Sequence, residues 1–258
     1  MIERSDFSHF RCFWTLFKKE ILRFFEVSGQ TLIAPLITAS LYLLIFGVSL
    51  GQRLSIFEHI TYLQFIIPGL ILMGVINNSF ANTSTSLFVS RYLGNIADLL
   101  VTPITPPQMI LAYTIAAMIR GMMVGGVILL VSMLFSDLPW VHPGQALIMI
   151  LLSSFLFSQF GIVAAVFAKN FETMAMFTNF IILPLVYLGG LFFPVQQLPH
   201  PWNLVSHLNP LFYLIEGFRT AVCGIEGLPF TTSLTVAVLM SVSLSIWAYH
   251  LLKTRLIG

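Results

Sequence analysis

The stretch LPLVYLGGLFFPVQQLPHPWNLVSHLNPLFYLIEGFR, residues 183–219, decides the fold of this chain. It begins inside an apolar run, residues 175–193, whose 19 residues are about enough to cross the ~30 Å hydrocarbon core of a bilayer. Four prolines then follow within 17 positions: Pro194, Pro199, Pro201 and Pro210. Each proline removes a backbone donor and crowds the preceding turn, which excludes one continuous helix. We therefore expect a membrane helix that ends near Pro194 and a hairpin that folds back toward the membrane.

The segment after the last of these prolines is apolar but short. Residues 211–223, LFYLIEGFRTAVC, number 13, too few to span a bilayer. Glu216 and Arg219 lie three positions apart and thus on one helical face. A seventh span here would bury both charges and would move the basic C-terminal end to the outer side. The pattern predicts a short amphipathic helix at the interface or dipping into it, within a hairpin over residues 194–223.

Composition indicates the class of protein. Hydrophobic residues make up 57% of the chain and charged residues 9%, whereas soluble domains carry about 25% charged residues. So few charges cannot cover a water-facing surface, and the 258 residues form one domain with room for roughly six spans of about 20 residues. We expect an all-α polytopic membrane protein. Nucleic-acid binding is not expected, since no basic stripe with interleaved aromatic residues is present.

Residues 7–28 predict an amphipathic helix. One face is apolar: Phe10, Phe13, Trp14, Phe17, Ile21, Phe24 and Phe25. The remaining surface carries basic residues: Arg11, Lys18, Lys19 and Arg23. Such a helix lies in the membrane interface, where anionic lipids of the cytoplasmic leaflet attract its basic residues. A soluble helix that binds a partner protein is the alternative.

Six spans follow from the apolar runs, over residues 30–50, 61–86, 108–135, 144–168, 175–193 and 231–252. Outside these spans, nine basic residues fall on one side: Arg4, Arg11, Lys18, Lys19, Arg23, Arg91, Lys169, Lys253 and Arg255. Only Arg53 and Arg219 fall on the other side. Because cytoplasmic flanks carry the excess of Lys and Arg, both termini are expected in the cytoplasm.

Enzymatic motifs are absent from the sequence. It contains no H-E-x-x-H, no G-x-S-x-G and no G-x-x-x-x-G-K-[ST] pattern. The six histidines show no ligand spacing on one helix; His200 and His207 share the outer hairpin, but solvated loop histidines are the simpler interpretation. We expect no catalytic residue, no metal site and no cofactor in this chain.

The second half of the second span is polar and reads NNSFANTSTS, residues 77–86. Asn78, Asn82 and Ser86 fall on one stripe. Polar groups in a bilayer need partners, so this stripe predicts either the cytoplasmic mouth of a transport path, interhelical hydrogen bonding, or a helix that extends into water. Arg120 is the one charge predicted near mid-membrane, and it either serves a path or pairs with a polar helix. Just after it, Gly121-x-x-x-Gly125 permits close helix approach.

The loop between spans two and three, RYLGNIADLLVTPITPPQ over residues 91–108, predicts a very short cytoplasmic helix. Asn95 is a plausible N-cap, Asp98 falls in the first turn, where the helix dipole favours it, and Pro103 ends the segment. Such a helix suggests a docking site for another protein. An ordinary interfacial turn is the alternative.

Arg91 and three segments together carry a family resemblance: GNIADLLVTP (94–103), YLGGLFFP (187–194) and LPHPWNLVSHLNPLFYLIEGFR (198–219). They resemble the membrane subunits of type-2 ABC exporters (ABC-2), most closely the bacterial YadH-like permeases. The resemblance implies a permease of the bacterial inner membrane that forms a homodimer around a central path and works with a separate ABC ATPase subunit. ATP and Mg would then reside on that subunit, and the cargo would be a lipid, a polysaccharide or a drug-like molecule.

The resemblance also implies roles for particular residues. ATPase coupling falls to Gly94, Asn95, Asp98, Leu99 and Leu100. The polar stripe of the second span and the charge in the third, rather than the resemblance, assign the transport path to Asn78, Asn82, Ser86 and Arg120. The outer gate falls to Pro194, Pro199, Pro201, Pro210, Glu216 and Arg219. An ion-coupled secondary carrier or channel is the alternative function, although it needs ionisable groups along the spans and only Arg120 is charged there.

Overall fold

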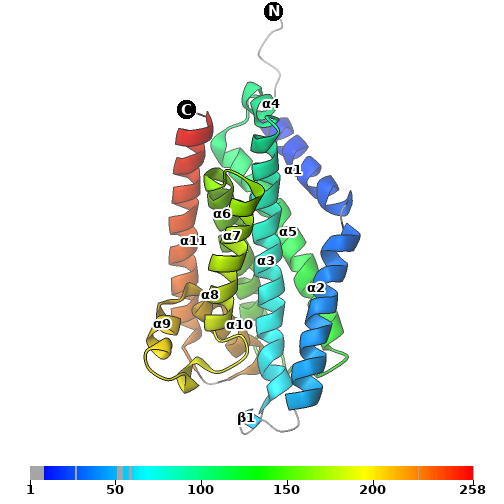
Figure 1. Ribbon diagram of the computed structural model, residues 1–258, viewed down its shortest axis with the longest axis vertical. Helices are drawn as coiled ribbons and strands as arrows, with labels where there is room; N and C mark the ends of the chain where they lie inside the picture. The colour runs from blue at the N-terminus through cyan, green and yellow to red at the C-terminus, as the bar shows by residue number, and fades with distance from the viewer. Residues whose placement is uncertain (1–8, 27, 51–54, 58–59, 226, 258) are drawn as a thin grey trace, which may run out of the picture.

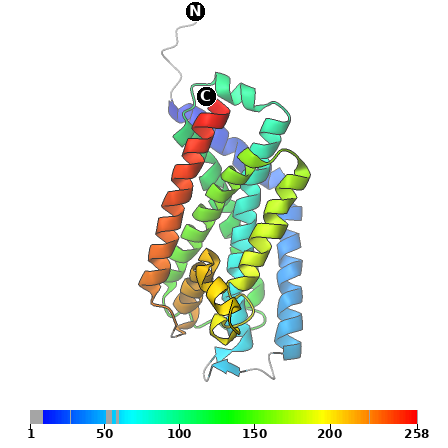
Figure 2. The same cartoon turned by 60° about the vertical axis from the view of Figure 1, so that its left-hand side comes forward.

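The computed structural model describes residues 9–26, 28–50, 55–57, 60–225 and 227–257. In this part of the chain, long helices run side by side along one axis and form an elongated bundle (Figures 1 and 2). The only strands described are β1 (Ser55–Phe57) and β2 (Ile60–Thr61), which pair antiparallel. The all-α polytopic class predicted from composition is confirmed.

Among the residues that the structure describes, five helical segments are long and apolar enough to cross a membrane. They are α3 (Tyr62–Tyr92), α5 (Pro106–Ser132), α6 (Pro143–Phe167), the segment Phe171–Leu188, and α11 (Phe230–Leu252) with its extension to Arg255. The segment Phe171–Leu188 consists of α7 (Phe171–Met176), a π-helical turn (Phe177–Ile182) and α8 (Leu183–Leu188).

A sixth candidate comes from the N-terminal helices. α1 (His9–Glu26) is followed by α2 (Ser28–Tyr42) and a π-helical stretch (Leu43–Leu50). The two helices are bent by 57° relative to each other, and Figure 1 shows α1 leaning across the bundle while α2 runs along it. The predicted division between an interfacial helix over 7–28 and a span over 30–50 falls at this bend.

α3 is the central helix of the bundle. It packs against α5, α6 and α10 (Pro210–Cys223). Small residues let these backbones approach: a Cβ atom on Gly121 would overlap Ser79 Oγ, and one on Gly161 would overlap Thr83 Oγ1. Gly125 of α5 also faces α3, at Val75. Both glycines of the Gly121-x-x-x-Gly125 pattern therefore face α3, as close approach requires.

Two helices end at residues other than the predicted span ends. α3 continues to Tyr92, beyond the predicted end of the second span at residue 86. The helix of the fifth predicted span ends at Leu188, before residue 193. There, Gly189 caps the helix and Gly190 has a φ of +83°, a left-handed conformation that suits glycine and stops the helix before Pro194.

The proline-rich segment forms a compact set of short helices. A 3-10 turn (Val195–Gln197) is followed by α9 (Trp202–Leu208) and α10. Pro210 occupies the first turn of α10, where a missing donor costs nothing, and Asn209 caps that helix by accepting a hydrogen bond from the Leu211 amide. The prolines thus separate the helices, and none interrupts one.

α10 lies deeper in the molecule than the sequence predicts. It packs against α3, α6 and α11, and most of its residues are buried. The expectation that a hairpin leaves Glu216 and Arg219 unburied is wrong, because their side chains are 9% and 1% exposed. The two charges compensate each other inside the protein.

The bundle has two distinct ends. α4 (Ile96–Val101) lies at one end together with the C-terminal end of α11 (Figure 1). We call this the α4 end. β1, α9 and α10 lie toward the opposite end, which we call the α9 end (Figures 1 and 2).

Candidate functional site

A buried carboxylate joins α1 to α3. Glu20 has no solvent exposure. Ser86 Oγ lies 2.7 Å from its Oε1, and Arg23 Nη2 donates to its Oε2 over 3.0 Å. A buried carboxylate is tolerated only when it is paired and hydrogen-bonded, and these two contacts supply both requirements.

Asn82 connects this pair to α5. Arg23 Nη2 donates to the Asn82 main-chain oxygen over 3.0 Å and to its Oδ1 over 3.1 Å. Arg120 Nη1 approaches the same Oδ1 at 3.4 Å, and its Nη2 approaches Thr31 Oγ1 of α2 at 3.4 Å. We call the set Glu20, Arg23, Thr31, Asn82, Ser86 and Arg120 the inner polar cluster. It ties four helices, α1, α2, α3 and α5, through side-chain contacts.

The structure brings together three of the four residues predicted for the transport path, namely Asn82, Ser86 and Arg120. Asn78 is not part of the cluster, because its amide donates to the Gly74 carbonyl of its own helix over 3.1 Å. Whether any of the four lines a path stays a prediction.

Sequence reasoning missed Glu20, Arg23 and Thr31 as site residues. The spacing of Glu20 from apolar residues of the same helix could have indicated that it is buried. Leu16 and Phe24, four positions before and after it, are 3% and 2% exposed, so Glu20 lies on the buried face of α1. A carboxylate on the apolar face of an amphipathic helix indicates a buried partner.

Arg219 forms the centre of a second cluster, toward the α9 end. Its Nη1 donates to Glu216 Oε2 over 2.8 Å, its Nε to the Phe65 carbonyl over 3.1 Å, and its Nη2 to the Gly190 carbonyl over 2.6 Å. The guanidinium carbon also lies 3.8 Å from the centroid of the Phe65 ring, within cation–π range. One side chain thereby fastens α10 to α3 and to the turn after α8.

A pocket of about 400 Å³ opens beside Glu216. Its lining consists of Phe65, Pro194, Gln196, Gln197, His207, Glu216, Ile225, Gly227 and Leu228. Of the residues predicted for the outer gate, Glu216 and Pro194 lie at this pocket. Pro199 and Pro201 are exposed outside it, and Pro210 starts α10. The structure therefore does not gather the six predicted gate residues at one place.

The predicted coupling segment forms the short helix α4. Gly94, with a φ of +78°, turns the chain out of α3, and its carbonyl accepts a hydrogen bond from the Ala97 amide over 3.1 Å. Asn95 is exposed beside it. The side chains of Asp98, Leu99 and Leu100 lie outside the described residues, although their backbone belongs to the helix.

Arg91 fixes the base of α4. Its Nη1 donates to the carbonyls of Ala165 and Val166, the latter over 2.9 Å. These carbonyls belong to the last turn of α6, where acceptors lack partners within the helix and cations are favoured. The end of α3, and with it the start of α4, is therefore held against α6.

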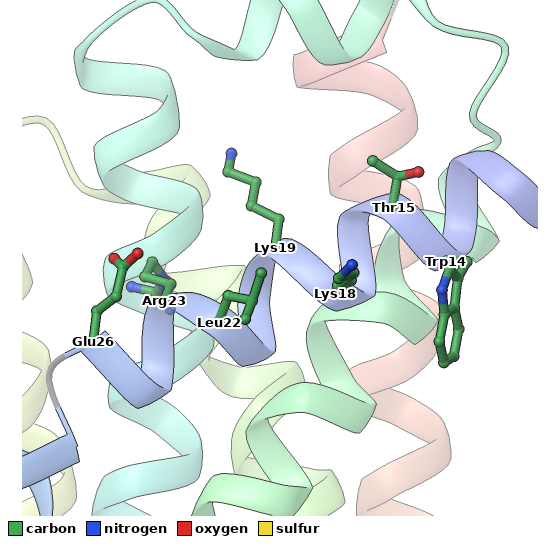
Figure 3. Close-up of a pocket in the computed structure, with 7 residues that line it drawn as sticks. All are labelled: Trp14, Thr15, Lys18, Lys19, Leu22, Arg23 and Glu26. Carbon is green, nitrogen blue, oxygen red and sulfur yellow. The ribbon is translucent and has the colours of Figure 1, made fainter.

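A wide, open groove of about 660 Å³ runs along α1 (Figure 3). Its lining consists of Trp14, Thr15, Lys18, Lys19, Leu22, Arg23 and Glu26. Figure 3 shows Thr15 and Lys19 pointing to one side of the helix and Trp14 pointing to the other. Arg23 belongs both to this groove and to the inner polar cluster.

No metal site is found in the part of the chain that the structure describes, since it contains no group of three or more His, Cys, Asp or Glu residues able to hold an ion. Cys12 and Cys223 are both free. Within the described residues, the arrangement thus offers the Glu20–Arg23 and Glu216–Arg219 ion pairs, the two pockets described above and the short helix α4.

Comparison with known proteins identifies the family. Residues 11–222 match the family described as "ABC-2 type transporter". The chain is 37% identical over 242 residues to "Inner membrane transport permease YadH" of Escherichia coli (strain K12), with 93% of each chain covered. It is also 23% identical over 210 residues to "Nodulation protein J" of Rhizobium meliloti (strain 1021), with 81% of this chain and 80% of the relative covered. Because the match extends over most of the chain, the protein belongs to the ABC-2 type transporter family.

Proposed function

We propose that this chain is the membrane permease subunit of an ATP-driven exporter in a bacterial inner membrane. The observation that carries the proposal is the family match over residues 11–222, together with several apolar helices long enough to span a bilayer. A relative whose name includes "inner membrane transport permease" supports the location. On this proposal both termini are cytoplasmic, and six spans and a re-entrant outer hairpin enclose half of a path that a second, identical subunit completes.

The ATPase is proposed to be a separate chain that holds ATP and Mg. Support comes from the sequence, which contains no G-x-x-x-x-G-K-[ST] pattern and thus no phosphate-binding loop. This chain would then not be an enzyme itself. α4 is the proposed docking element because it projects from the α4 end of the bundle (Figure 1) and is held at its base by Arg91. Because Arg91 holds the base of α4 against α6, α4 can transmit a movement of the ATPase to α3.

Within the membrane, the polar half of α3 is proposed to brace or line the cytoplasmic half of the path. Asn82 and Ser86 are buried there against Arg23 and Glu20, which suits a region whose hydrogen bonds change between states. At the α9 end, Arg219 joins three elements that would separate when the path opens outward. The cargo is proposed, from the family, to be a lipid, a polysaccharide or a drug-like molecule.

Copurification tests the coupling proposal. The chain is extracted from its native membrane in mild detergent, and stoichiometric partners are identified by mass spectrometry. We expect an ATPase with a phosphate-binding loop to accompany the wild-type chain and to be lost from the Leu99→Asp/Leu100→Asp variant. The matched control is Leu134→Asp, which places the same change on a leucine that is 83% exposed beyond α5. Equal recovery of the ATPase with the double variant contradicts the proposed role of α4.

An ion-coupled secondary carrier remains the second candidate. One observation favours it: the structure places Glu20 and Arg23 beside Arg120, so the inner polar cluster contains the ionisable groups that such carriers need. Transport in vesicles that contain the permease but no ATPase would support the carrier. Transport that requires the ATPase and ATP would exclude it.

A further inference from the structure

We propose that the inner polar cluster binds the phosphate of an anionic phospholipid from the leaflet at the α4 end. The binding atoms would be the guanidinium groups of Arg23 and Arg120 and the amide nitrogen of Asn82. The inference goes beyond the export function and does not depend on it, since lipid binding is a property of the permease alone.

The first observation is an imbalance of charge. Arg23 and Arg120 both contact Asn82 Oδ1, at 3.1 and 3.4 Å, which brings two guanidinium groups to one oxygen. Within the described part of the chain, Glu20 forms an ion pair with Arg23 alone. Among the described residues, no carboxylate forms an ion pair with Arg120, whose two side-chain hydrogen bonds are long. A partly buried arginine without a counter-ion is unfavourable near a membrane, and a phosphate would supply the missing charge.

The second observation is a surplus of donors. Within the described part of the chain, Nε of Arg23, Nε of Arg120 and Nδ2 of Asn82 are buried and have no hydrogen-bond partner. Asn82 itself has no solvent exposure. Because both guanidinium groups contact the side chain of Asn82, the three donors lie in one small region. Phosphate oxygens accept several charge-assisted hydrogen bonds at once, and arginine suits them geometrically.

The third observation is a route from the membrane surface. The Arg23 side chain is 31% exposed and lines the groove along α1, whose other cations are Lys18 and Lys19 (Figure 3). An anion that approaches this basic surface reaches Arg23 before it reaches the buried donors. Glu26 also lines the groove, so three cations outnumber one carboxylate there and the groove keeps a net positive charge.

The groove favours a lipid over a free anion. Trp14 and Leu22, which are 52% and 50% exposed, line the groove together with Lys18, Lys19 and Arg23 (Figure 3). A ligand in this groove therefore meets both cations and exposed apolar side chains. A phospholipid can satisfy both, because it carries a charged headgroup and apolar acyl chains. The site would fasten α1 to α3 and α5 through a bound lipid.

Native mass spectrometry of the purified full chain in detergent tests the proposal. The protein is titrated with phosphatidylglycerol and, separately, with phosphatidylcholine of the same acyl chains. For the wild type we expect phosphatidylglycerol to bind about tenfold more tightly, equivalent to about 1.4 kcal/mol. For Arg120→Gln we expect the preference to fall below about twofold, because the charge and the donors on α5 are lost.

Lys169→Gln is the matched control, since it removes one exposed basic side chain from the loop between α6 and α7. It is expected to keep the wild-type preference. If Arg120→Gln does not yield a monodisperse protein, Arg23→Gln, at the exposed side of the cluster, is expected to show the same loss. Equal binding of the two lipids by the wild type, or an unchanged preference in both arginine variants, overturns the proposal. Displacement of phosphatidylglycerol by millimolar inorganic phosphate overturns the assignment to a lipid.

Discussion

Arg219 is a charged residue in the interior of the protein. Its side chain is 1% exposed, and its charge is balanced by Glu216, which is itself largely buried. Desolvation of both groups is costly, so the pair stabilises the fold only as a unit. Removing one member leaves the other charge unpaired in the interior, which is far worse than the loss of one contact.

We therefore expect Arg219→Met to destabilise the protein by about 3–5 kcal/mol. The double variant Glu216→Gln/Arg219→Met is expected to be more stable than the single variant, because it leaves no unpaired charge. Thermal unfolding in detergent, followed by size-exclusion chromatography, measures both. Arg255→Gln, on an exposed side chain, serves as the control and should unfold at the wild-type temperature. A double variant that is less stable than Arg219→Met would contradict this account.

At the scale of elements, Gly121 and Gly126 lie close together on α5 but differ in how tightly they pack against neighbouring helices. On α5, a Cβ atom on Gly121 would overlap Ser79 Oγ and lie 3.0 Å from Ser154 Oγ, whereas a Cβ atom on Gly126 would meet nothing within 4 Å. The two positions lie on one helix and differ in what they face. Alanine substitutions at the two positions therefore distinguish the effect of helix propensity on stability from the effect of packing.

Gly121→Ala is expected to destabilise the protein by about 1–3 kcal/mol, because α3 and α6 must move away from α5. Gly126→Ala is expected to be neutral or to stabilise it by up to ~1 kcal/mol, since alanine favours a helix more than glycine does. Both are measured by thermal unfolding in the same detergent. Equal stability of the two variants would show that close approach at Gly121 is not required.

The same scale shows which parts of the fold the sequence predicts. The break at Pro194 and the separate helices after it follow from local sterics of proline, so they are readable from the sequence alone. The earlier helix end at Leu188 depends on Gly189 and Gly190, a signal that was present beside the stronger proline signal. The burial of α10 could not be predicted, because it depends on which helices surround it.

The candidate site shows a similar limit. Polar residues of α3 signal a need for partners, but the sequence does not say where the partners come from. Arg120 is visible as a charge within an apolar run, whereas Glu20 and Arg23 belong to a helix that reads as interfacial. They join the cluster because α1 packs against α5 and its side chains reach Asn82 and Ser86 of α3. The sequence predicts a division between α1 and α2, but it does not show which helices α1 contacts.

The whole molecule has two chemically different ends. α4 and the C-terminal end of α11 lie at one end, and α9 lies toward the other (Figure 1). Outside the third predicted span, the sequence assigns nine Lys and Arg residues to the α4 side and two to the α9 side. Because basic flanks are retained in the cytoplasm, this asymmetry predicts the orientation of the entire bundle. The opposite orientation would put α4, the proposed ATPase docking element, outside the cell.

Cysteine labelling of intact spheroplasts measures that orientation. In a chain whose Cys12 and Cys223 are replaced by serine, Asn95→Cys tests the exposed start of α4 and His200→Cys tests the exposed turn before α9. We expect a membrane-impermeant maleimide to label His200→Cys at once, because its thiol faces the outside. It is expected to label Asn95→Cys only after the membrane is permeabilised. Both variants should react equally in detergent, which controls for thiol accessibility. Labelling of Asn95→Cys in intact spheroplasts would reverse the topology and remove α4 from reach of any cytoplasmic ATPase.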